Sequence, residues 1–550
     1  MSTGSGFIEE KLTPATVVTG SAVRGWYRWY VLTVLIAVYT FGYVDRQIVT
    51  VLAPYLKADL HITDAQLGLL YGTTFALFYG LFGIPLARIA DGWSRVKTLA
   101  LGLSFWSLMT ALSGMAGSFA QLGSARVGVG VGEASSTPAA VSLLGDYFER
   151  ERRATVLGLY SVGVYIGAGL SLMIGGGVVA FWQRHFVTAE QAPFGLSGWQ
   201  AAFMAVGLPG LLLGLLIRLT IREPVRGALE AAPQPDEPQP FRKALSVLGS
   251  MIPPWNIVQL VRDGAPRREV TKAVLGIPVA VAGCAAITAL TDAALAPERR
   301  AVLGTVVGFA ITSNLVQWIA MMVAFYACGS WFQSVRLRDP QAARMLTASP
   351  TFRALTLAGA FLAFSMNATT GFVFVYAYRY LGFTAADGLH LGVIAAVAGG
   401  IGITVSGFLS DYARRVHPVG RLVFVCITAT LFTIASLVEF LTTDIAIFYG
   451  AFAIATFFVP MWFAPNQATT QDLVIPRLRG TAFAMYSLGA NILGLGLGPY
   501  TVGLISDTTG DLRIAILCAL GTLPFTVATL IYAARHIAVD EAAVAIAIAD

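Results

Sequence analysis

Two pairs of ionisable residues inside long apolar stretches of this sequence have types and spacing that could do chemistry: Asp45 and Arg46, then Arg126 and Glu133. An ionisable side chain at the centre of a membrane-spanning helix costs roughly 2.5–3.5 kcal/mol by insertion scales, so such residues should pair or face water. Arg126 and Glu133 are seven residues apart, which puts them on one helical face, about 10 Å apart along the axis. A residue from another helix fits between them, and we expect Asp45 to be that residue.

This pattern predicts proton-coupled binding of an anion. Desolvation favours a neutral carboxyl group and a neighbouring arginine favours the carboxylate, so substrate or conformation can change proton occupancy. We expect Asp45 and Glu133 to carry protons, and Arg126, with Arg46 as a second candidate, to hold them or the anion. Two alternatives remain open: a static Asp45–Arg126 bridge between two helices, and a position for Arg46 at the membrane surface.

The composition indicates a membrane environment for these charges. Of the 550 residues, 56% are hydrophobic and 12% are charged, whereas soluble proteins have roughly a quarter of their residues charged. Many apolar runs exceed the ~20 residues that cross a bilayer as a helix, and lipid-exposed backbone must be satisfied within helices or closed barrels. The sequence therefore predicts an all-α polytopic membrane protein.

About 14 spans are predicted, and they divide the chain into five parts. The spans lie near 29–52, 67–90, 98–118, 120–145, 154–181, 200–221, 273–293, 302–328, 352–381, 386–411, 420–441, 444–468, 480–505 and 512–534. The parts are an N-terminal segment (1–28), a first six-helix lobe (29–222), an inter-lobe insert with an interfacial segment and two extra spans (223–350), a second six-helix lobe (351–536) and a C-terminal tail (537–550). The stretch 233–240 is rich in proline and is expected to be a loop.

Basic residues in alternate loops predict that both termini are cytoplasmic, by the positive-inside rule. Those loops contain Arg95, Lys97, Arg150, Arg152, Arg153, Arg218, Arg222, Arg226, Arg336, Arg338, Arg414, Arg415, Arg477 and Arg479. Arg299, Arg300 and Arg513 are exceptions on the other side. We expect a multi-pass protein of the plasma (inner) membrane, acting as a monomer.

The two lobes are predicted to be parallel repeats. The stretch Arg153-Ala-Thr155…Tyr160-Ser-Val-Gly163 recurs as Arg479-Gly-Thr481…Tyr486-Ser-Leu-Gly489, offset by 326 residues, and Asp146 and Asp472 share this offset. The extra length lies in the insert, in which 241–262 mixes apolar and basic residues. This segment is predicted either to lie flat at the membrane surface or to be an ordinary linker.

Two loops resemble the signature of the major facilitator superfamily, in which acidic and basic residues clamp neighbouring helices. The first has Asp91, Arg95 and Lys97, and the second reads Gly407-Phe-Leu-Ser-Asp411-Tyr-Ala-Arg414-Arg415. Ala87 and Gly92 depart from the pattern in the first copy. The resemblance implies the major facilitator fold, with two extra helices between its lobes, and conformational roles for these charged residues.

Within that superfamily, the chain is similar to the Spinster family. The matching stretches are Tyr43-Val-Asp45-Arg46, Arg126-Val-Gly-Val-Gly-Val-Gly132-Glu133-Ala134 and Asn491-Ile-Leu-Gly-Leu-Gly-Leu-Gly-Pro499…Gly503-Leu-Ile-Ser-Asp507. The resemblance covers nearly everything outside about 230–345. It implies secondary transport of lysophospholipids or sphingoid phosphates with proton coupling; the alternative is a proton-coupled exporter of small organic anions or hydrophobic drugs.

The second lobe offers neutral polar residues instead of a matching charged set, so ion coupling is expected in the first lobe. Candidate substrate contacts there are Asn367, Thr370, Tyr376, Asn466, Gln467 and Asn491, although such residues more often bond between helices. The sequence predicts no cofactor, no metal site, no nucleic-acid partner and no enzymatic activity. It has no phosphate-loop motif, and its five histidines are scattered along the chain.

Overall fold

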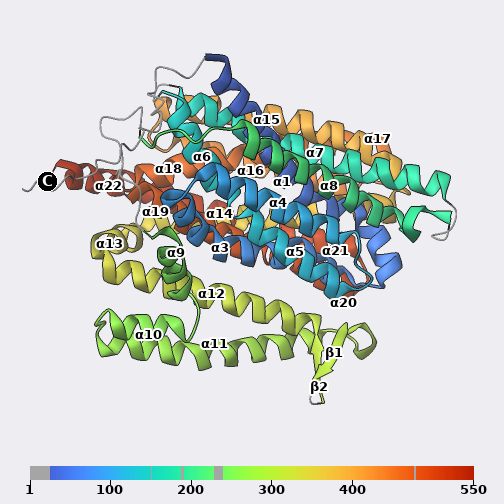
Figure 1. The fold of residues 1–550 in the computed structure, drawn as a ribbon, viewed down its shortest axis with the longest axis horizontal. Helices are drawn as coiled ribbons and strands as arrows, with labels where there is room; N and C mark the ends of the chain where they lie inside the picture. The colour runs from blue at the N-terminus through green and yellow to red at the C-terminus, as the bar shows by residue number, and fades with distance from the viewer. Residues whose placement is uncertain are drawn as a thin grey trace, which may run out of the picture.

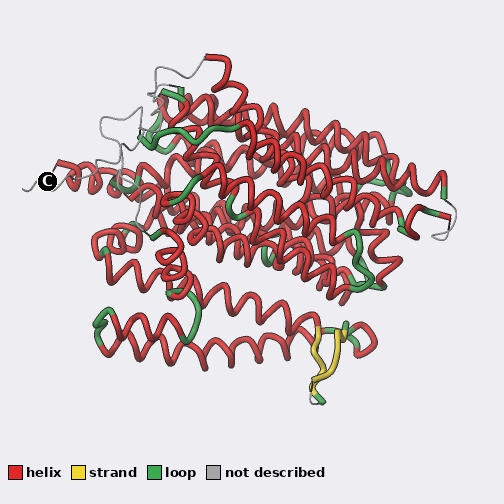
Figure 2. Tube along the Cα trace, viewed as in Figure 1, coloured by secondary structure: helices red, strands yellow, loops and turns green. Residues whose placement is uncertain are grey.

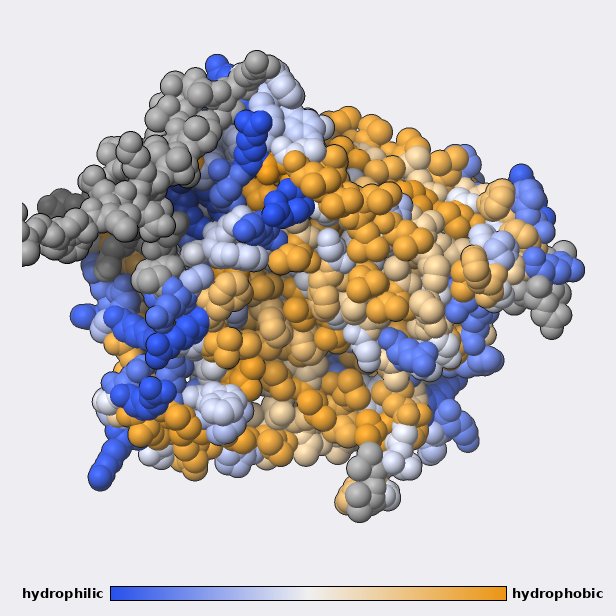
Figure 3. All heavy atoms as spheres, in the orientation of Figure 1, coloured by the Kyte–Doolittle hydropathy of each residue, from blue (hydrophilic) through white to orange (hydrophobic). Residues whose placement is uncertain are grey.

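The computed structural model describes residues 25–149, 152–186, 191–227, 239–306, 308–475 and 478–549. Within these residues, 13 helices are long and apolar enough to cross a membrane, and most run along the long axis of the molecule (Figure 1). Figure 2 shows helix almost throughout, apart from one short pair of strands. Apolar residues form a broad band across the middle of the face in Figure 3, and hydrophilic residues gather at both ends. The predicted polytopic α-helical bundle is confirmed.

The first lobe comprises α1 to α8. Its elements are α1 (Gly25–Leu60), α2 (Asp64–Gly68), the π-helical turn η1 (Leu69–Thr73), α3 (Thr74–Gly92), α4 (Arg95–Ser113), α5 (Phe119–Glu133), α6 (Ser136–Tyr147), α7 (Arg153–His185) and α8 (Gly198–Thr220). The segments α2, η1 and α3 follow one another without a break and together form the second span.

The second lobe comprises α14 to α22. Its elements are α14 (Pro350–Tyr380), α15 (Gly388–Val416), α16 (Gly420–Leu441), α17 (Ile445–Phe458), η6 (Val459–Trp462), α18 (Phe463–Asp472), α19 (Arg479–Gly489), the π-helical turn η8 (Ala490–Leu495), α20 (Gly498–Thr509), α21 (Leu512–Leu520) and α22 (Leu523–Ala549). Because α22 continues to Ala549, residues 537–549 are helical and extend the last span instead of forming a separate tail.

The fourth predicted span, 120–145, is two shorter helices, and for this reason it is not among the 13 candidates. The chain leaves the helix at Ala134 and Ser135, between α5 and α6. Pro138 accounts for the break, because proline has no N–H to donate to the carbonyl group four residues earlier, that of Ala134. The helical hydrogen-bond pattern is therefore interrupted directly after Glu133, while Ala134 and Ser135 keep α-helical dihedral angles.

The insert lies along one side of the bundle, with α12 next to the lobes and α11 outermost (Figure 1). Its elements are α9 (Pro240–Gly249), α10 (Trp255–Arg262), α11 (Arg267–Ala294), β1 (Val302–Val306), β2 (Phe309–Thr312), α12 (Ser313–Arg338) and α13 (Pro340–Ala348). The predicted span at 302–328 is wrong at its start, since 302–312 contains a hairpin and α12 runs on to Arg338. Gly308, at a φ of 81°, provides the left-handed turn residue, and the flanking β-branched residues favour strands.

The predicted segment 241–262 forms two short helices, α9 and α10, which expose apolar side chains such as Leu245 and Trp255. The stretch 233–238 and residues 1–24 of the predicted N-terminal segment lie outside the described residues. α1 begins at Gly25, four residues before the predicted start of the first span.

The predicted repeat is visible in matching ion pairs at one end of the bundle. Arg95 pairs with Asp146, and 326 positions later Arg421 pairs with Asp472 at 2.7 Å. Each pair joins the start of the third span of its lobe to the end of the fourth. The two lobes are therefore built on the same plan.

The lobes are in close contact at the end of the bundle that carries Asp64, called here the Asp64 end. A Cβ atom on Gly503 would lie 2.2 Å from the carbonyl oxygen of Asp64, and one on Gly176 would lie 2.3 Å from that of Ala385. At the opposite end, called the Asp91 end, a Cβ atom on Gly158 would have no atom within 4 Å. The space between the lobes is thus closed at the Asp64 end.

Candidate functional site

An ion pair between Arg46 of α1 and Glu133 of α5 lies inside the first lobe. Arg46 Nη2 is 2.5 Å from Glu133 Oε1, and 11% and 4% of the two side chains are exposed. Gly42, one turn before Arg46, gives the carboxylate room, because a Cβ atom there would lie 3.3 Å from Glu133 Oε1. Charge-assisted hydrogen bonds of this kind are short and strong, and here the pair is largely shielded from water.

Three aromatic rings surround the guanidinium group of Arg46. Its Cζ atom lies 4.2 Å from the ring centroid of Phe75, 4.6 Å from that of Tyr43 and 5.2 Å from that of Tyr79. Cation–π attraction is worth about 2 kcal/mol or more when the cation is desolvated. The rings therefore help to hold the charge of Arg46 away from bulk water. This burial argues against a position of Arg46 at the membrane surface.

One face of α1 remains partly exposed beside this pair. Tyr39, Tyr43 and Arg46 lie on it at helical spacing and are neither fully buried nor fully exposed. Tyr39 also stacks on Tyr160 of α7, with ring centroids 4.4 Å apart. The accessible part of the site is thus an aromatic wall with one cation in it.

Arg126 and Asp45 form a second, deeper contact. Arg126 Nη1 donates to the backbone carbonyl oxygen of Asp45 over 2.8 Å, and the two residues are 0% and 1% exposed. Within the described residues, the Asp45 carboxylate oxygens and Arg126 Nε and Nη2 make no direct hydrogen bond. The Asp45 carboxylate faces Thr110 and Trp106 of α4.

The predicted arrangement of the four charges is therefore corrected in one respect. Arg46, and not Asp45, lies against Glu133, and Arg126 bonds to the backbone of Asp45 instead of its carboxylate. The reason is helical geometry: neighbouring residues of α1 point about 100° apart, so Arg46 and Asp45 face different helices. The structure still gathers all four residues between α1 and α5.

Three of the six second-lobe candidates bond to their own helices. Asn367, Thr370 and Asn491 donate to backbone carbonyl groups four residues earlier, at 2.7, 2.8 and 2.9 Å. Thr370 and Asn491 are partly exposed, whereas Asn367 is buried. Such bonds satisfy each side chain within its own helix. The partly exposed side chains, Thr370 and Asn491, can exchange these bonds for hydrogen bonds to a substrate.

Tyr376 holds the second lobe together. Its hydroxyl group donates to the carbonyl oxygen of Phe440 over 2.7 Å and accepts from Arg513 over 3.1 Å, and none of the residue is exposed. Asn466 is also fully buried, with no direct hydrogen bond to its amide group in the described part of the chain. Gln467 is partly exposed. Tyr376 and Asn466, which were predicted as candidate substrate contacts, are thus buried inside the lobe in this conformation.

The second lobe contains one buried carboxylic acid that the sequence analysis missed. Glu439 of α16 is 3% exposed, and no hydrogen bond or ion pair is described for it. The sequence signal was a single glutamate within the apolar run Leu437-Val-Glu-Phe-Leu441. Among the residues that the structure describes, no arginine forms an ion pair with Glu439, in contrast to Glu133.

A polar network that joins the lobes at the Asp64 end was also missed. Asp64 of α2 pairs with Lys57 of α1 and with Arg379 of α14, whose Nη2 lies 3.0 Å from Asp64 Oδ1. Ser506 of α20 donates to Asp64 Oδ2 over 2.7 Å. Asp507 accepts from the backbone N–H groups of Asp64 and Ala65 at 3.1 and 2.8 Å, so it caps a helix of the other lobe. These bonds fasten the lobes together in this conformation.

The loop-motif residues lie at the Asp91 end, as two sets. In the first, Arg95 is 1% exposed and donates to Glu223 over 2.8 Å in addition to its pair with Asp146. Lys97 lies over the ring of Trp93, and Asp91 is exposed.

The second set uses other helices for the same purpose. Arg414 binds both carboxylate oxygens of Glu541 in α22, at 2.6 and 2.7 Å. Asp411 pairs with Arg421 at 2.9 Å, and Arg415 is exposed. In both lobes, these residues connect span ends within one lobe.

Comparison with known sequences gives matches along most of the chain. Residues 35–499 match the model of the Major Facilitator Superfamily. An MFS-type efflux pump of Mycolicibacterium smegmatis is 25% identical over 485 residues, which cover 88% of this chain and 85% of the pump. Similarity to Spinster proteins is more local: Protein spinster homolog 1 of Xenopus tropicalis is 31% identical over 208 residues, 37% of this chain and 37% of that protein.

Solved structures share the fold. A bacterial homolog of the human lysosomal transporter Spinster, in an inward-facing and unoccupied conformation, superposes with a TM-score of 0.66 over 94% of this chain and 99% of that chain, at 24% identity. The POT family transporter PepTSo gives a TM-score of 0.59 over 93% and 98% of the two chains, at 14% identity. Identities this low support the shared architecture of two lobes and nothing finer.

Proposed function

This chain belongs to the Major Facilitator Superfamily and is a membrane-embedded secondary transporter, not an enzyme, and we propose that it carries an amphipathic anion together with protons. The anion we propose is a lysophospholipid or a sphingoid phosphate. The observation that carries this proposal is the buried Arg46–Glu133 pair beside a partly exposed aromatic wall.

The pair supplies a mechanism for coupling. A phosphate group that binds Arg46 competes with Glu133 for the same guanidinium group. Once displaced, a desolvated carboxylate is costly, and it is relieved by taking up a proton. When the proton leaves, Glu133 again pairs with Arg46 and the anion is released. Substrate and proton thus bind together and leave together, because both depend on whether Arg46 is paired with Glu133.

Arg126 and Asp45, which lie deeper in the first lobe, support this coupling of substrate and proton. Arg126 keeps Nε and Nη2 free of direct hydrogen bonds within the described residues, and it lies close enough to donate to the backbone of Asp45. It therefore holds positive charge near both carboxylates whichever proton state they adopt. We propose that Asp45 is the second proton carrier.

We propose that the Asp91 end is cytoplasmic, which makes this conformation inward-facing. The basic residues of the loops support this orientation by the positive-inside rule. Two of the exceptions on the other side are held by the protein itself: Arg299 donates to the carbonyl oxygen of Asp507 over 2.7 Å, and Arg513 lies 5.3 Å from the ring centroid of Tyr380. The Asp64 network then forms the closed outer gate.

Export of hydrophobic drugs or small organic anions is the second candidate. The similarity to a mycobacterial efflux pump extends over 88% of this chain, far more than the similarity to Spinster proteins. The same Arg46–Glu133 pair and aromatic wall would serve such a substrate. The two candidates differ in whether the substrate carries a single long hydrocarbon chain.

Transport by reconstituted protein tests both candidates. Proteoliposomes would be assayed with radiolabelled lysophosphatidic acid, with and without an inward proton gradient, for wild type, Glu133→Gln and Glu439→Gln. We expect the gradient to stimulate wild type and Glu439→Gln, and Glu133→Gln to lose that response. Glu439→Gln is the matched control, since it also replaces a buried carboxylic acid within a span.

Each failure has its own meaning. A full gradient response in Glu133→Gln would refute the assignment of Glu133. If wild type moves no lysolipid under any gradient but expels a hydrophobic cation or organic anion, the efflux candidate replaces the first.

A further inference from the structure

Two hydrogen-bond donors of α4 lie inside the first lobe without a partner. Trp106 and Thr110 are both 0% exposed, and within the described residues neither Trp106 Nε1 nor Thr110 Oγ1 makes a direct hydrogen bond. Ser113, on the same helix, bonds instead to its own backbone, at the carbonyl oxygen of Met109 over 3.0 Å. Buried polar groups are nearly always hydrogen-bonded, so each exception calls for an explanation.

Other tryptophans of the first lobe have partners for their indole groups. Trp182 Nε1 donates to the carbonyl oxygen of Leu196 over 2.8 Å, and Trp199 Nε1 donates to the carboxylate of Asp59 over 2.6 Å. A buried indole N–H usually finds such a partner. The exception at Trp106 indicates an acceptor that bonds to it in another state of the site.

Glycines of α5 hold this part of α4 in place. A Cβ atom on Gly132 would lie 2.8 Å from Trp106 Cβ, and one on Gly128 would lie 2.5 Å from Met109 Cγ. The two helices therefore touch along this stretch, as small residues allow. Because Trp106 is also fully buried, its indole group has no route to water or lipid.

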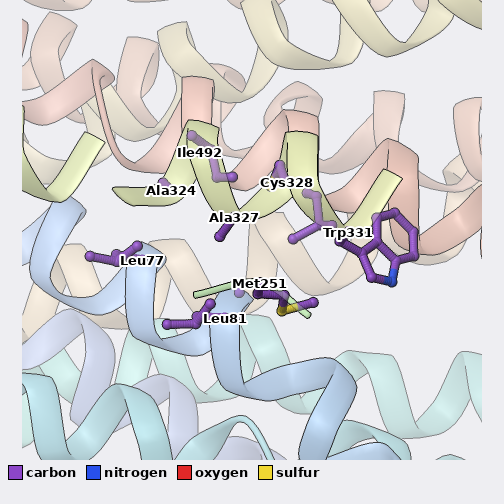
Figure 4. Close-up of a pocket in the computed structure, with 10 residues that line it drawn as sticks. Leu77, Leu81, Met251, Ala324, Ala327, Cys328, Trp331 and Ile492 are labelled. Carbon is purple, nitrogen blue, oxygen red and sulfur yellow. The ribbon is translucent and has the colours of Figure 1, made fainter. Parts of the chain in front are cut away.

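The cavity between the insert and the lobes has the opposite chemistry. Figure 4 shows Leu77 and Leu81 of α3, Ala324 and Cys328 of α12, and Ile492 of η8 around it. In the described part of the chain, none of the side chains that line it has a buried nitrogen or oxygen atom without a hydrogen bond. Helix packing in this molecule therefore does not by itself require unpartnered donors.

Both donors of α4 face the carboxylate of Asp45. Asp45 is 1% exposed, and its two carboxylate oxygens also lack a direct hydrogen bond among the described residues. The charged groups that face this carboxylate are Arg126 and Glu133 of α5. The other long helices packed against α1, which are α4, α6, α7, α8 and α14, carry their charged residues near their ends. Unpartnered donors and an unpartnered acceptor thus lie opposite one another.

Arg126 does not take the place of these donors. Its Nη1 atom donates to the backbone carbonyl oxygen of Asp45 over 2.8 Å and not to the carboxylate. A buried carboxylate without hydrogen bonds is costly, so an ionised Asp45 needs other donors. Trp106 and Thr110 can supply them while Arg126 keeps its present bond.

We infer that Trp106 and Thr110 donate hydrogen bonds to the ionised carboxylate of Asp45 and so set the pH at which Asp45 takes up a proton. This inference rests on the proposed function, in which Asp45 is the second proton carrier. Trp106 and Thr110 are positioning residues, since they act on the carboxyl group and not on the substrate.

The two donors differ in what they offer each form of Asp45. An indole N–H only donates, so Trp106 favours the carboxylate. A hydroxyl group donates and accepts, so Thr110 donates to the carboxylate and accepts from the O–H group of the carboxylic acid. Loss of Trp106 should therefore affect protonation more than loss of Thr110.

Infrared spectroscopy of the full-length protein in nanodiscs measures the protonation of Asp45 directly. The probe is the C=O stretch of the carboxylic acid, titrated with pH and assigned by its loss in Asp45→Asn. A hydrogen bond to a charged group changes a protonation equilibrium by roughly tenfold or more, so Trp106→Phe should move the midpoint up by about one pH unit. Thr110→Val should move it in the same direction by less. Midpoints equal to wild type in both variants would overturn the inference.

Two further variants serve as controls. Ser107→Ala removes another buried hydroxyl group of α4, which faces Gly210 of α8, and it should titrate as wild type does. A shift in Ser107→Ala as large as that in Trp106→Phe would overturn the inference. Thr110→Ser keeps the hydroxyl group and should restore the wild-type midpoint. Thr110→Val preserves the shape of the side chain, so it tests the inference even where Trp106→Phe does not fold.

The pH profile of transport is an independent measurement. In proteoliposomes, uptake of lysophosphatidic acid by Trp106→Phe should reach half its maximal rate about one pH unit above wild type, with an unchanged KM at the plateau. A uniform loss of rate with an unmoved midpoint would indicate a structural role and overturn the inference. An Asp45 band that does not titrate in wild type would refute its role as a proton carrier in the proposed function. A band that titrates but ignores the α4 variants would refute the inference alone.

Discussion

The two lobes share the ion pairs at the Asp91 end but differ in the polar residues buried inside them. Arg95–Asp146 in the first lobe and Arg421–Asp472 in the second occupy matching positions, 326 residues apart. Inside the helical bundle, the first lobe holds an arginine and a glutamate 2.5 Å apart, whereas the second holds buried tyrosines, amides and a lone glutamate. The duplicated pairs connect span ends in both lobes, which is a mechanical role. The Arg46–Glu133 pair occurs in the first lobe alone among the described residues, and it is therefore the candidate for proton coupling.

The largest expected effect follows from breaking the unduplicated pair. Arg46→Met leaves Glu133 buried without its partner, and removal of one member of a buried ion pair costs about 3–5 kcal/mol. We expect a large loss of thermal stability in detergent, measured by fluorescence-detected size exclusion, and no gradient-driven transport. The double variant Arg46→Met/Glu133→Gln should regain most of the stability but none of the coupling. Proton-coupled transport by Arg46→Met would contradict the assignment of coupling to the first lobe.

Breaking the duplicated pairs should have smaller and unequal effects. Arg95→Met removes a side chain that is 2% exposed and pairs with two carboxylates, so a loss of roughly 3 kcal/mol is expected. Arg421 pairs with carboxylates that are 60% and 42% exposed, and exposed pairs are worth about 0–1 kcal/mol. Arg95→Met and Arg421→Met should both lower the transport rate while keeping the proton-to-substrate ratio of wild type. A changed ratio in either variant would assign coupling to these loops.

An effect smaller than that of Arg95→Met is expected from the buried tyrosine of the second lobe, Tyr376. Tyr376→Phe removes a hydroxyl group that bonds to Phe440 and Arg513, at a cost of about 1–2 kcal/mol. The thermal midpoint should fall slightly, and the KM for substrate should match that of wild type. Thr370→Val is the control, because Thr370 lies on the same helix at a partly exposed position where it can contact substrate, so a raised KM is compatible with its role. A raised KM in Tyr376→Phe would show that this tyrosine reaches the substrate.

The smallest effect concerns the loop before α21. A hydrogen bond from the Tyr380 hydroxyl group, together with backbone N–H groups, holds the pKa of Asp511 below its ordinary value. A depressed pKa in the folded state contributes stability above the ordinary aspartate range, and that contribution is lost as the pH falls through the folded-state value. Asp511→Asn should therefore be slightly less stable than wild type at pH 7 and equal to it in strong acid. An equal deficit at both pH values would exclude the ionised carboxylate as the cause.

Much of the fold could be predicted because lipid imposes a simple pattern. Runs of about 20 apolar residues predict membrane spans, and the recurring charged loops predict the repeat. The break after Glu133 and the hairpin at 302–312 could not be predicted in this way, since hydropathy does not distinguish an apolar helix from an apolar turn or strand. Pro138 and Gly308 were the available signals for these two features.

The site was predictable in content but not in pairing. Charges inside apolar runs identified all four residues, because lipid makes such residues costly unless they have a role. Which arginine meets Glu133 depends on the rotation of α1 against α5, which is set by packing across the whole lobe. The Asp64 network was hidden for a similar reason: Asp64 and Asp507 are 443 residues apart, and both stand at span ends, where charges are ordinary.

The divided fourth span has a consequence for biogenesis. α5 has 15 residues and α6 has 12, each shorter than a bilayer-spanning helix, and α5 also carries Arg126 and Glu133. We expect that the insertion machinery cannot release this stretch into lipid by itself. Because α1 is synthesised first, Arg46 is already in place to neutralise Glu133 when α5 emerges from the ribosome. The Arg46–Glu133 pair, to which we assign coupling, would then first be needed for insertion of the chain into the membrane.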